Sequence, residues 1–173
     1  IRVEDKEEKV FSFYSSSSDL SINKDGVFLL PYVSETVSYV ALYDKNGKRI
    51  KKYDGYYDGT FSSSSIILAS SIDRITYLTV INENGEVEKE VELGRDVTVH
   101  EFTSNDKGVF FLLSRKGEEK IAYLDNGGLY LLDTPSSIAF SSLSIDGNIL
   151  SFSYLDKNRE GLLPKYGEID TDS

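Results

Sequence analysis

Residues 40–47 read VALYDKNG, residues 78–85 read LTVINENG and residues 121–127 read IAYLDNG, and these three stretches decide the fold. In each stretch an apolar run leads into Asn-Gly, and the pattern recurs about every 40 residues. Asn-Gly between two apolar runs favours a β-hairpin with a type I′ turn, because both residues tolerate a positive φ. The sequence therefore predicts a hairpin at each of these positions.

A second turn signal lies before the hairpins. Asp25-Gly26, Lys107-Gly108 and Asp146-Gly147 each introduce an apolar run, whereas the run at 66–68 has no such pair before it. The two signals together predict four antiparallel strands in about 40 residues. We expect a single all-β domain over 1–173 with acidic N- and C-terminal tails and about four repeats, at 12–55, 60–95, 97–135 and 137–165.

The last repeat is incomplete in the sequence. Its third strand is doubtful around 161–166, because Pro164 cannot donate a backbone hydrogen bond and argues against a central strand. Residues 10–14 are apolar and could supply a strand to this repeat. Otherwise a partner chain, or further repeats of a longer chain, would complete a ring.

The order of turn, strand, turn and strand resembles WD-repeat and related β-propeller families. The resemblance spans nearly the whole chain, although the Gly-His and Trp-Asp signatures of true WD repeats are absent. It implies tandem four-stranded antiparallel blades arranged around an axis. The alternative fold is a β-sandwich with several similar hairpins.

The composition limits the classes of partner that we expect. Acidic side chains number 29 and basic ones 19, giving a net charge of −10, so nucleic acid is not expected as a partner. No apolar run reaches the roughly 18 residues that cross a bilayer. The absence of Cys and Met, with abundant Glu, Lys, Ile, Val and Tyr, suits a heat-stable protein. Since the chain begins at Ile1, an upstream signal or anchor stays open, and so does the compartment, cytoplasmic or extracellular.

No catalytic or metal-binding signature emerges. His100 is the only histidine and lies in an alternating strand pattern without a nucleophile motif, so we interpret it as an ordinary strand residue. Asp54 and Asp58, and Asp170 and Asp172, are the nearest calcium candidates, but their spacing does not match an EF-hand loop. We expect no enzyme activity, no metal and no cofactor.

Two features indicate a contact surface. The first is an aromatic loop from Tyr53 to Gly59, because tyrosines on a glycine-rich loop bury much area at small entropic cost. The second is a run of bases that flanks the turn at 46–47. As outer-strand residues they could equally serve only to discourage edge pairing. The predicted partner-binding residues are Tyr53, Tyr56, Tyr57, Lys51 and Lys52, within the basic run Lys45, Lys48, Arg49, Lys51 and Lys52.

The leading hypothesis is a non-catalytic protein-binding or scaffold domain. It rests on the resemblance and on the absence of catalytic motifs, since function on such a fold usually lies on its loops. The alternative is an extracellular or cell-surface carbohydrate-binding domain. A third reading is a propeller-type hydrolase that uses scattered acids at the centre of the ring.

Overall fold

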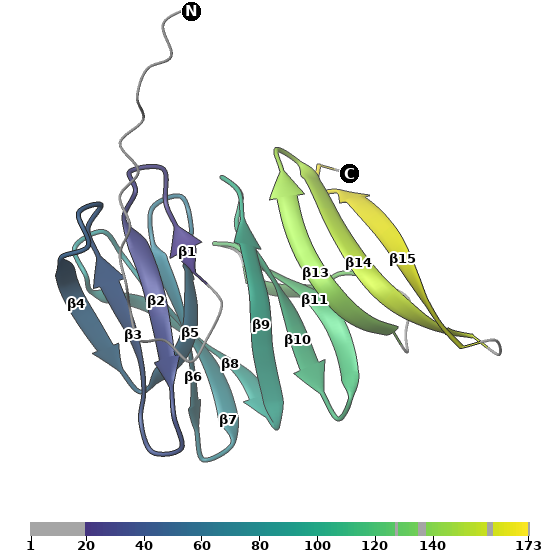
Figure 1. The fold of residues 1–173 in the computed structure, drawn as a ribbon, viewed down its shortest axis with the longest axis horizontal. Helices are drawn as coiled ribbons and strands as arrows, with labels where there is room; N and C mark the ends of the chain where they lie inside the picture. The colour runs from purple at the N-terminus through teal and green to yellow at the C-terminus, as the bar shows by residue number, and fades with distance from the viewer. Residues whose placement is uncertain (1–19, 127, 135–137, 159–160, 173) are drawn as a thin grey trace, which may run out of the picture.

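The computed structural model describes residues 20–126, 128–134, 138–158 and 161–172. The strand expected at 10–14 lies outside these residues. The described chain is all-β and contains no helix (Figure 1). Every strand pair is antiparallel, as the alternation of turn and strand signals predicts.

The strands form four sheets that follow one another along the chain. The first sheet has the order β1(Ser21–Ile22), β2(Phe28–Val33), β3(Ser38–Tyr43), β4(Arg49–Asp54). The second has β5(Tyr56–Phe61), β6(Ile66–Ile72), β7(Ile75–Ile81), β8(Val87–Arg95). The third has β9(Val97–Ser104), β10(Val109–Arg115), β11(Glu118–Leu124), β12(Leu129–Leu131). The fourth has three strands, β13(Ile138–Asp146), β14(Ile149–Asn158), β15(Gly161–Asp170).

The sheets are arranged as a fan around one edge (Figure 1). The first strands of successive sheets contact each other, β1 with β5, β5 with β9 and β9 with β13. These strands therefore lie nearest the axis, and the fourth strands β4, β8 and β12 lie at the periphery. A sandwich would instead place two sheets face to face, so the sandwich alternative is wrong.

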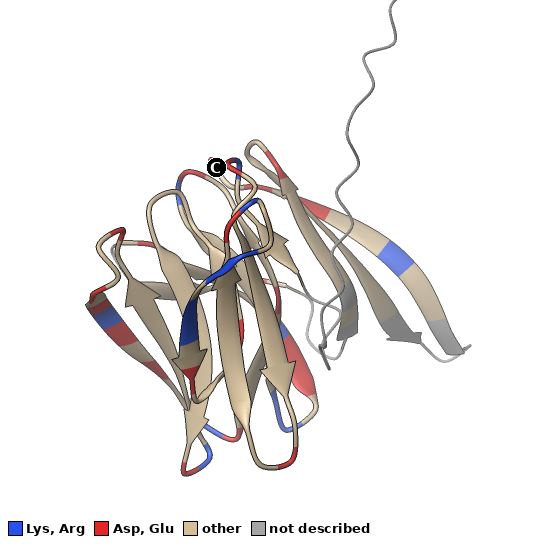
Figure 2. Ribbon diagram, turned by 60° about the vertical axis from the view of Figure 1, so that its left-hand side comes forward, with Lys and Arg blue, Asp and Glu red and all other residues tan. Residues whose placement is uncertain are grey.

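Apolar residues fill the spaces between neighbouring sheets. One cluster, including Leu29, Val40 and Leu68, joins the first and second sheets. A second joins the second and third sheets through residues that include Leu78 and Phe111. A third joins the third and fourth sheets through residues that include Leu112, Leu150 and Phe152. The second and third sheets thus carry apolar residues on both faces. Charged residues gather in turns and on outer strands such as β8 (Figure 2).

The Asn-Gly turns differ from the predicted type. A type I′ turn needs a positive φ at both central residues, but in the first hairpin Gly47 has φ 77° and Asn46 is not left-handed. The turn is stabilised instead by Asp44, whose Oδ1 accepts N–H groups from Asn46 at 2.8 Å and Lys48 at 2.9 Å. Asn82 makes the same pair of bonds at 3.0 Å in the second sheet. The type I′ prediction is therefore wrong at these two turns, which share an Asp or Asn three residues before the glycine.

The fourth sheet corrects the doubt about its third strand. β15 pairs with β14 over its whole length, from Gly161 to Asp170. Pro164 fits because β15 lies at the edge of the sheet, where one row of backbone groups has no neighbouring strand among the described residues.

Candidate binding site at the axis

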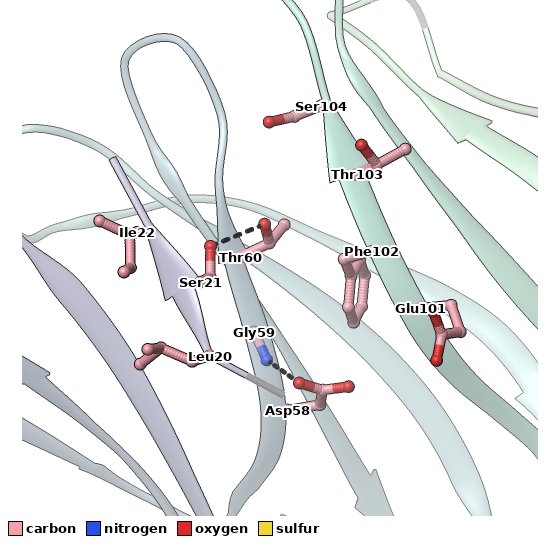
Figure 3. A pocket seen from close by; sticks show the side chains of 10 residues that line it. All are labelled: Leu20, Ser21, Ile22, Asp58, Gly59, Thr60, Glu101, Phe102, Thr103 and Ser104. Carbon is pink, nitrogen blue, oxygen red and sulfur yellow. Dashed lines mark hydrogen bonds between the residues drawn. The ribbon is translucent and has the colours of Figure 1, made fainter. Parts of the chain in front are cut away.

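The first strands of three sheets enclose a pocket at the axis (Figure 3). It has a volume of about 420 Å³ and opens between β1, β5 and β9. Its lining combines hydroxyl groups, two carboxylates and one aromatic ring, contributed by Leu20, Ser21, Ile22, Asp58, Gly59, Thr60, Glu101, Phe102, Thr103 and Ser104. The pocket is therefore lined mainly by polar groups, in contrast to the apolar clusters that join neighbouring sheets.

A β-bulge in β5 places Asp58 at this pocket. Tyr57 is an extra residue between the pairs Tyr56–Ser70 and Asp58–Ala69, so the side chains that follow it change face. Asp58 is only 7% exposed, and its Oδ1 accepts the N–H of Gly59 at 2.8 Å. Gly59 is needed for close approach to β6, because a Cβ there would lie 2.6 Å from Leu68 Cδ2.

A second bulge places Glu101 at the same pocket. In β9, Glu101 and Phe102 oppose the single residue Phe111. Glu101 has φ 54°, a left-handed conformation that is uncommon for a residue other than glycine and costs on the order of 1 kcal/mol. Bulges and strained residues are frequent next to functional sites, where they redirect a side chain.

Hydroxyl groups join the three strands around the pocket. The Ser21 and Thr60 hydroxyls lie 3.1 Å apart, and Ser21 Oγ also accepts the Phe61 N–H at 3.3 Å. Ser104 donates its hydroxyl to the Phe61 carbonyl at 2.8 Å. Figure 3 shows the Ser21–Thr60 contact beside Asp58 and Gly59. These bonds hold the walls of the pocket at fixed positions.

The charge of the pocket is one-sided. Among the residues that the structure describes, two carboxylates line it and no Lys, Arg or His does. Phe102 lies 5.6 Å from Phe111 between ring centroids, so its ring is supported by the core. The arrangement suits a ligand that carries a cation or several hydroxyl groups. Among the described residues, no group of three or more Asp, Glu or His is placed to hold a metal ion.

The predicted aromatic loop is a pair of strands. Tyr53 lies near the end of β4, and Tyr56 and Tyr57 are the first two residues of β5. Only Gly55 separates the two strands. Tyr53 is 8% exposed and packs in the cluster between the first and second sheets, against which Tyr56 also packs. The loop prediction is wrong because the glycines permit a tight connection and a close strand approach, with no extended loop.

Tyr57 connects the second and third sheets. Its hydroxyl accepts the Val99 N–H at 3.3 Å. Burial raises the pKa of Tyr57 above its ordinary value of 10.0, while the Val99 hydrogen bond opposes part of that rise. The buried parts of these tyrosines therefore stabilise contacts between sheets.

The predicted lysines lie on β4 with neighbours of their own. Lys52 Nζ is 2.5 Å from Asp54 Oδ1 and 4.4 Å from the centre of the Tyr39 ring. Lys51 Nζ is 3.3 Å from the Gly85 carbonyl oxygen and 4.9 Å from the centre of the Tyr53 ring. Neither lysine lines the axial pocket. Their role in partner binding stays a prediction.

Of His100 and the two pairs of carboxylates considered for calcium, only Asp58 lines the axial pocket. His100 Nε2 lies 3.5 Å from Glu119 Oε1. Asp54 pairs with Lys52, whereas Asp58 lines the axis, so the two carboxylates have different surroundings. Asp172 pairs with Lys107, and its N–H donates to Asp170 Oδ1 at 2.9 Å.

The sequence reasoning did not identify Glu101 as a site residue, and it considered Asp58 only for calcium. The only feature of the sequence that could have indicated these site residues is a carboxylate or hydroxyl side chain within each expected first strand. That signal is weak, because the chain has 29 acidic residues and the register shift of a bulge cannot be seen in the pattern.

Comparison with known proteins supports the architecture. No family model matches the sequence, and no curated protein sequence matches it. Among solved structures, the Dos1 propeller aligns over 78% of this chain and 41% of its own, with a TM-score of 0.52 and 11% identity. The chain has a β-propeller fold. The first strands at the axis are the inner strands of its blades.

Two further solved structures are similar to this propeller. An uncharacterized protein of Listeria monocytogenes EGD-e, lmo1340, aligns over 94% of this chain and 58% of its own, with a TM-score of 0.51 and 15% identity. A structure from a study of two prolyl endopeptidases aligns over 88% of this chain and 26% of its own, with a TM-score of 0.51 and 16% identity. The propeller described here thus spans between a quarter and three-fifths of the length of these three chains.

At these identities the similarity concerns the fold alone. It supports the propeller part of the resemblance, whereas no family model matches that would support the WD-repeat family in particular. In the described part of the chain, no helix has the length and hydropathy needed to cross a membrane.

Proposed function

We propose that this propeller is a non-catalytic binding domain whose axial pocket accepts a cationic side chain of a protein partner. The observation that carries the proposal is the lining of the pocket by Asp58 and Glu101, with no base among the described lining residues. A lysine or arginine side chain would find two carboxylates, several hydroxyl oxygens and the face of Phe102, and all three groups favour a cation.

The position of the pocket supports this function. An axial site on a propeller is built by strands from several blades, so it is rigid before the ligand binds. Here the hydrogen bonds of Ser21 and Ser104 join β1, β5 and β9. A preformed site loses little conformational entropy on binding. This property favours a ligand-binding function over catalysis that requires a conformational change.

A matched pair of variants tests the proposal. The probe is a fluorescent peptide of alternating lysine and glycine, titrated by anisotropy at about 150 mM salt, where exposed charges are largely screened. Glu101→Gln should weaken binding about tenfold, whereas Glu90→Gln, which removes one charge from exposed β8, should change it less than about twofold. Equal effects of the two variants would contradict a specific axial site.

A sugar ligand is the second candidate, because Phe102 lies beside hydroxyl and carboxylate oxygens in the same pocket. Titration with soluble oligosaccharides, followed by NMR, tests it. Binding without products would support the carbohydrate-binding alternative. Release of new reducing ends that Glu101→Gln abolishes would instead support the hydrolase reading, since a pair of carboxylates can cleave a glycosidic bond.

A further inference from the structure

A second hollow lies between the second and third sheets, beside the start of β9 and the turn that joins β10 to β11. It has a volume of about 610 Å³. One wall is Leu93 of β8, and the facing wall comes from β9, β10, β11 and β12 of the third sheet. We call it the outer groove. It is lined by Leu93, Val97, Leu113, Arg115, Lys116, Glu118, Lys120, Leu129 and Leu131.

The outer groove lies beside the cluster that joins the two sheets. That cluster, which includes Leu78, Val99 and Phe111, fills the neighbouring space between them. On the side of the third sheet, β12 has only three residues, against nine in β8. The third sheet therefore ends early, and Leu131 remains 60% exposed at the end of the groove.

The floor of the groove is aliphatic. Leu93, Leu113 and Leu129 are half-buried and pack against the neighbouring core cluster. Together with Leu131 they form an apolar surface that remains partly in contact with water. Covering it with an aliphatic side chain would be favourable, because apolar area would be removed from water.

The rim of the groove is basic. Arg115, Lys116 and Lys120 line it, against a single acid, Glu118. Arg115 and Lys116 are exposed, and within the described part of the chain neither belongs to an ion pair. Lys120 donates to the Thr134 carbonyl at 3.4 Å. In a chain with a net charge of −10, this local excess of positive charge favours an anionic ligand.

We propose that the outer groove binds an acidic peptide segment of a partner protein, with one aliphatic side chain of that segment on the leucine floor. Carboxylates on either side of the aliphatic residue would pair with Arg115 and Lys116. The apolar floor and the basic rim must act together, so neither a neutral apolar peptide nor a polyanion without apolar groups fits the site. This proposal does not depend on the axial pocket.

Three labelled octapeptides test the proposal by fluorescence anisotropy. The first consists of Glu and Asp with a central leucine, the second has serine in place of leucine, and the third has Gln and Asn in place of the acids. We expect the first peptide to bind and each of the others to bind at least fivefold more weakly. Absence of binding by the first peptide at about 1 mM would overturn the proposal, and so would equal binding of the first and second peptides.

Protein variants locate the binding. Arg115→Glu with Lys116→Glu should weaken binding of the first peptide more than tenfold, and Leu131→Ser about fivefold. The matched control is Lys48→Glu with Arg49→Glu, which reverses two exposed bases on the first sheet and should change affinity less than twofold. Circular dichroism confirms that each variant is folded. An equal loss in the control pair would overturn the proposal, because the effect would then come from net charge alone.

A second copy of the chain is the competing occupant. Sedimentation of the unmodified protein over a hundredfold range of concentration tests it. If the protein forms a dimer and the Leu131→Ser variant is a monomer, the peptide proposal would be overturned in favour of self-association. A monomer throughout, together with peptide binding, would support a separate partner.

Discussion

The first and third sheets both carry clustered bases, but their surroundings differ. On the first sheet, Lys51 contacts the Gly85 carbonyl and Lys52 pairs with Asp54. On the third sheet, Arg115 and Lys116 project beside an apolar floor without an ion pair among the described residues. The denser cluster in the sequence is thus the one whose charges already have neighbours. Availability for a ligand depends on local geometry more than on the density of charge.

The two sheets also differ in their packing. The third sheet contributes Phe111 to the cluster facing the second sheet and Leu112 to the cluster facing the fourth. The first sheet contributes to only one of the three clusters, the one it shares with the second sheet. The third sheet is therefore the more central element of the described fold, and its core residues should matter more for stability.

The largest expected difference concerns two leucines. Leu112→Ala on the third sheet should lower the free energy of unfolding by about 3–5 kcal/mol, because Leu112 is fully buried. Leu42→Ala on the first sheet should cost about 1–2 kcal/mol, because Leu42 is half-buried at the margin of its cluster. Urea denaturation followed by circular dichroism measures both. Equal losses would contradict the central position of the third sheet.

The next prediction concerns the tyrosine that links the second and third sheets. The pKa of Tyr57 is raised above 10.0 in the folded protein, mainly by burial. Above about pH 10 the unfolded chain loses this proton while the folded chain keeps it, so stability falls as the pH rises. Tyr57→Phe should remove this part of the alkaline loss.

Tyr57→Phe also removes the acceptor of the Val99 N–H, at a cost of about 1–2 kcal/mol near neutral pH. Tyr53→Phe on the first sheet is the comparison. The pKa of Tyr53 is also raised by burial. Unlike that of Tyr57, its hydroxyl makes no hydrogen bond to the backbone of another sheet in the described structure. Denaturation at pH 7 and pH 10.5 separates the two effects. A Tyr57→Phe variant as stable as the parent at pH 7 would contradict the hydrogen-bond role.

The sequence allowed the fold to be predicted because its signals are local. A glycine needed for a positive φ, as at Gly47 and Gly85, and apolar runs between turns can be recognised without knowing the tertiary structure. The residues that determine the turn type are also local in sequence, since Asp44 and Asn82 stabilise the observed turns and belong to the repeated stretches 40–47 and 78–85. Recurrence every 40 residues then favoured repeated sheets.

The site was not predictable in the same way, because its position depends on packing between strands distant in sequence. Asp58 and Glu101 reach one pocket only through a bulge in β5 and another in β9. Tyr53 and Tyr57 appeared to lie on a loop because glycines flank them, yet Gly55 permits a one-residue connection between strands and Gly59 allows close strand packing. Local composition cannot distinguish these two uses of glycine.

A smaller difference should separate the lysines of the two sheets. Lys52→Ala removes an ion pair with Asp54 and a contact with the Tyr39 ring, for a loss of about 0.5–1 kcal/mol at low salt. Arg115→Ala should change stability by less than about 0.5 kcal/mol, because Arg115 is exposed and has no ion pair among the described residues. Thermal denaturation at two salt concentrations measures both. A larger loss for Arg115→Ala would reverse the comparison.

The smallest expected effect separates the stability of the third sheet from its proposed binding role. Lys116 has φ 53°, which strains a residue with a Cβ, and Lys116→Gly relieves that strain. The flexibility of glycine in the unfolded chain offsets part of the gain, so the net stabilisation should be about 0.5 kcal/mol or less. Lys116→Ala retains the Cβ and should show no gain. Because both variants remove the same charge from the outer groove, both should weaken binding of the acidic peptide equally, although only one becomes more stable. A parallel change in stability and affinity would mean that Lys116 acts on the turn and has no direct contact with the ligand.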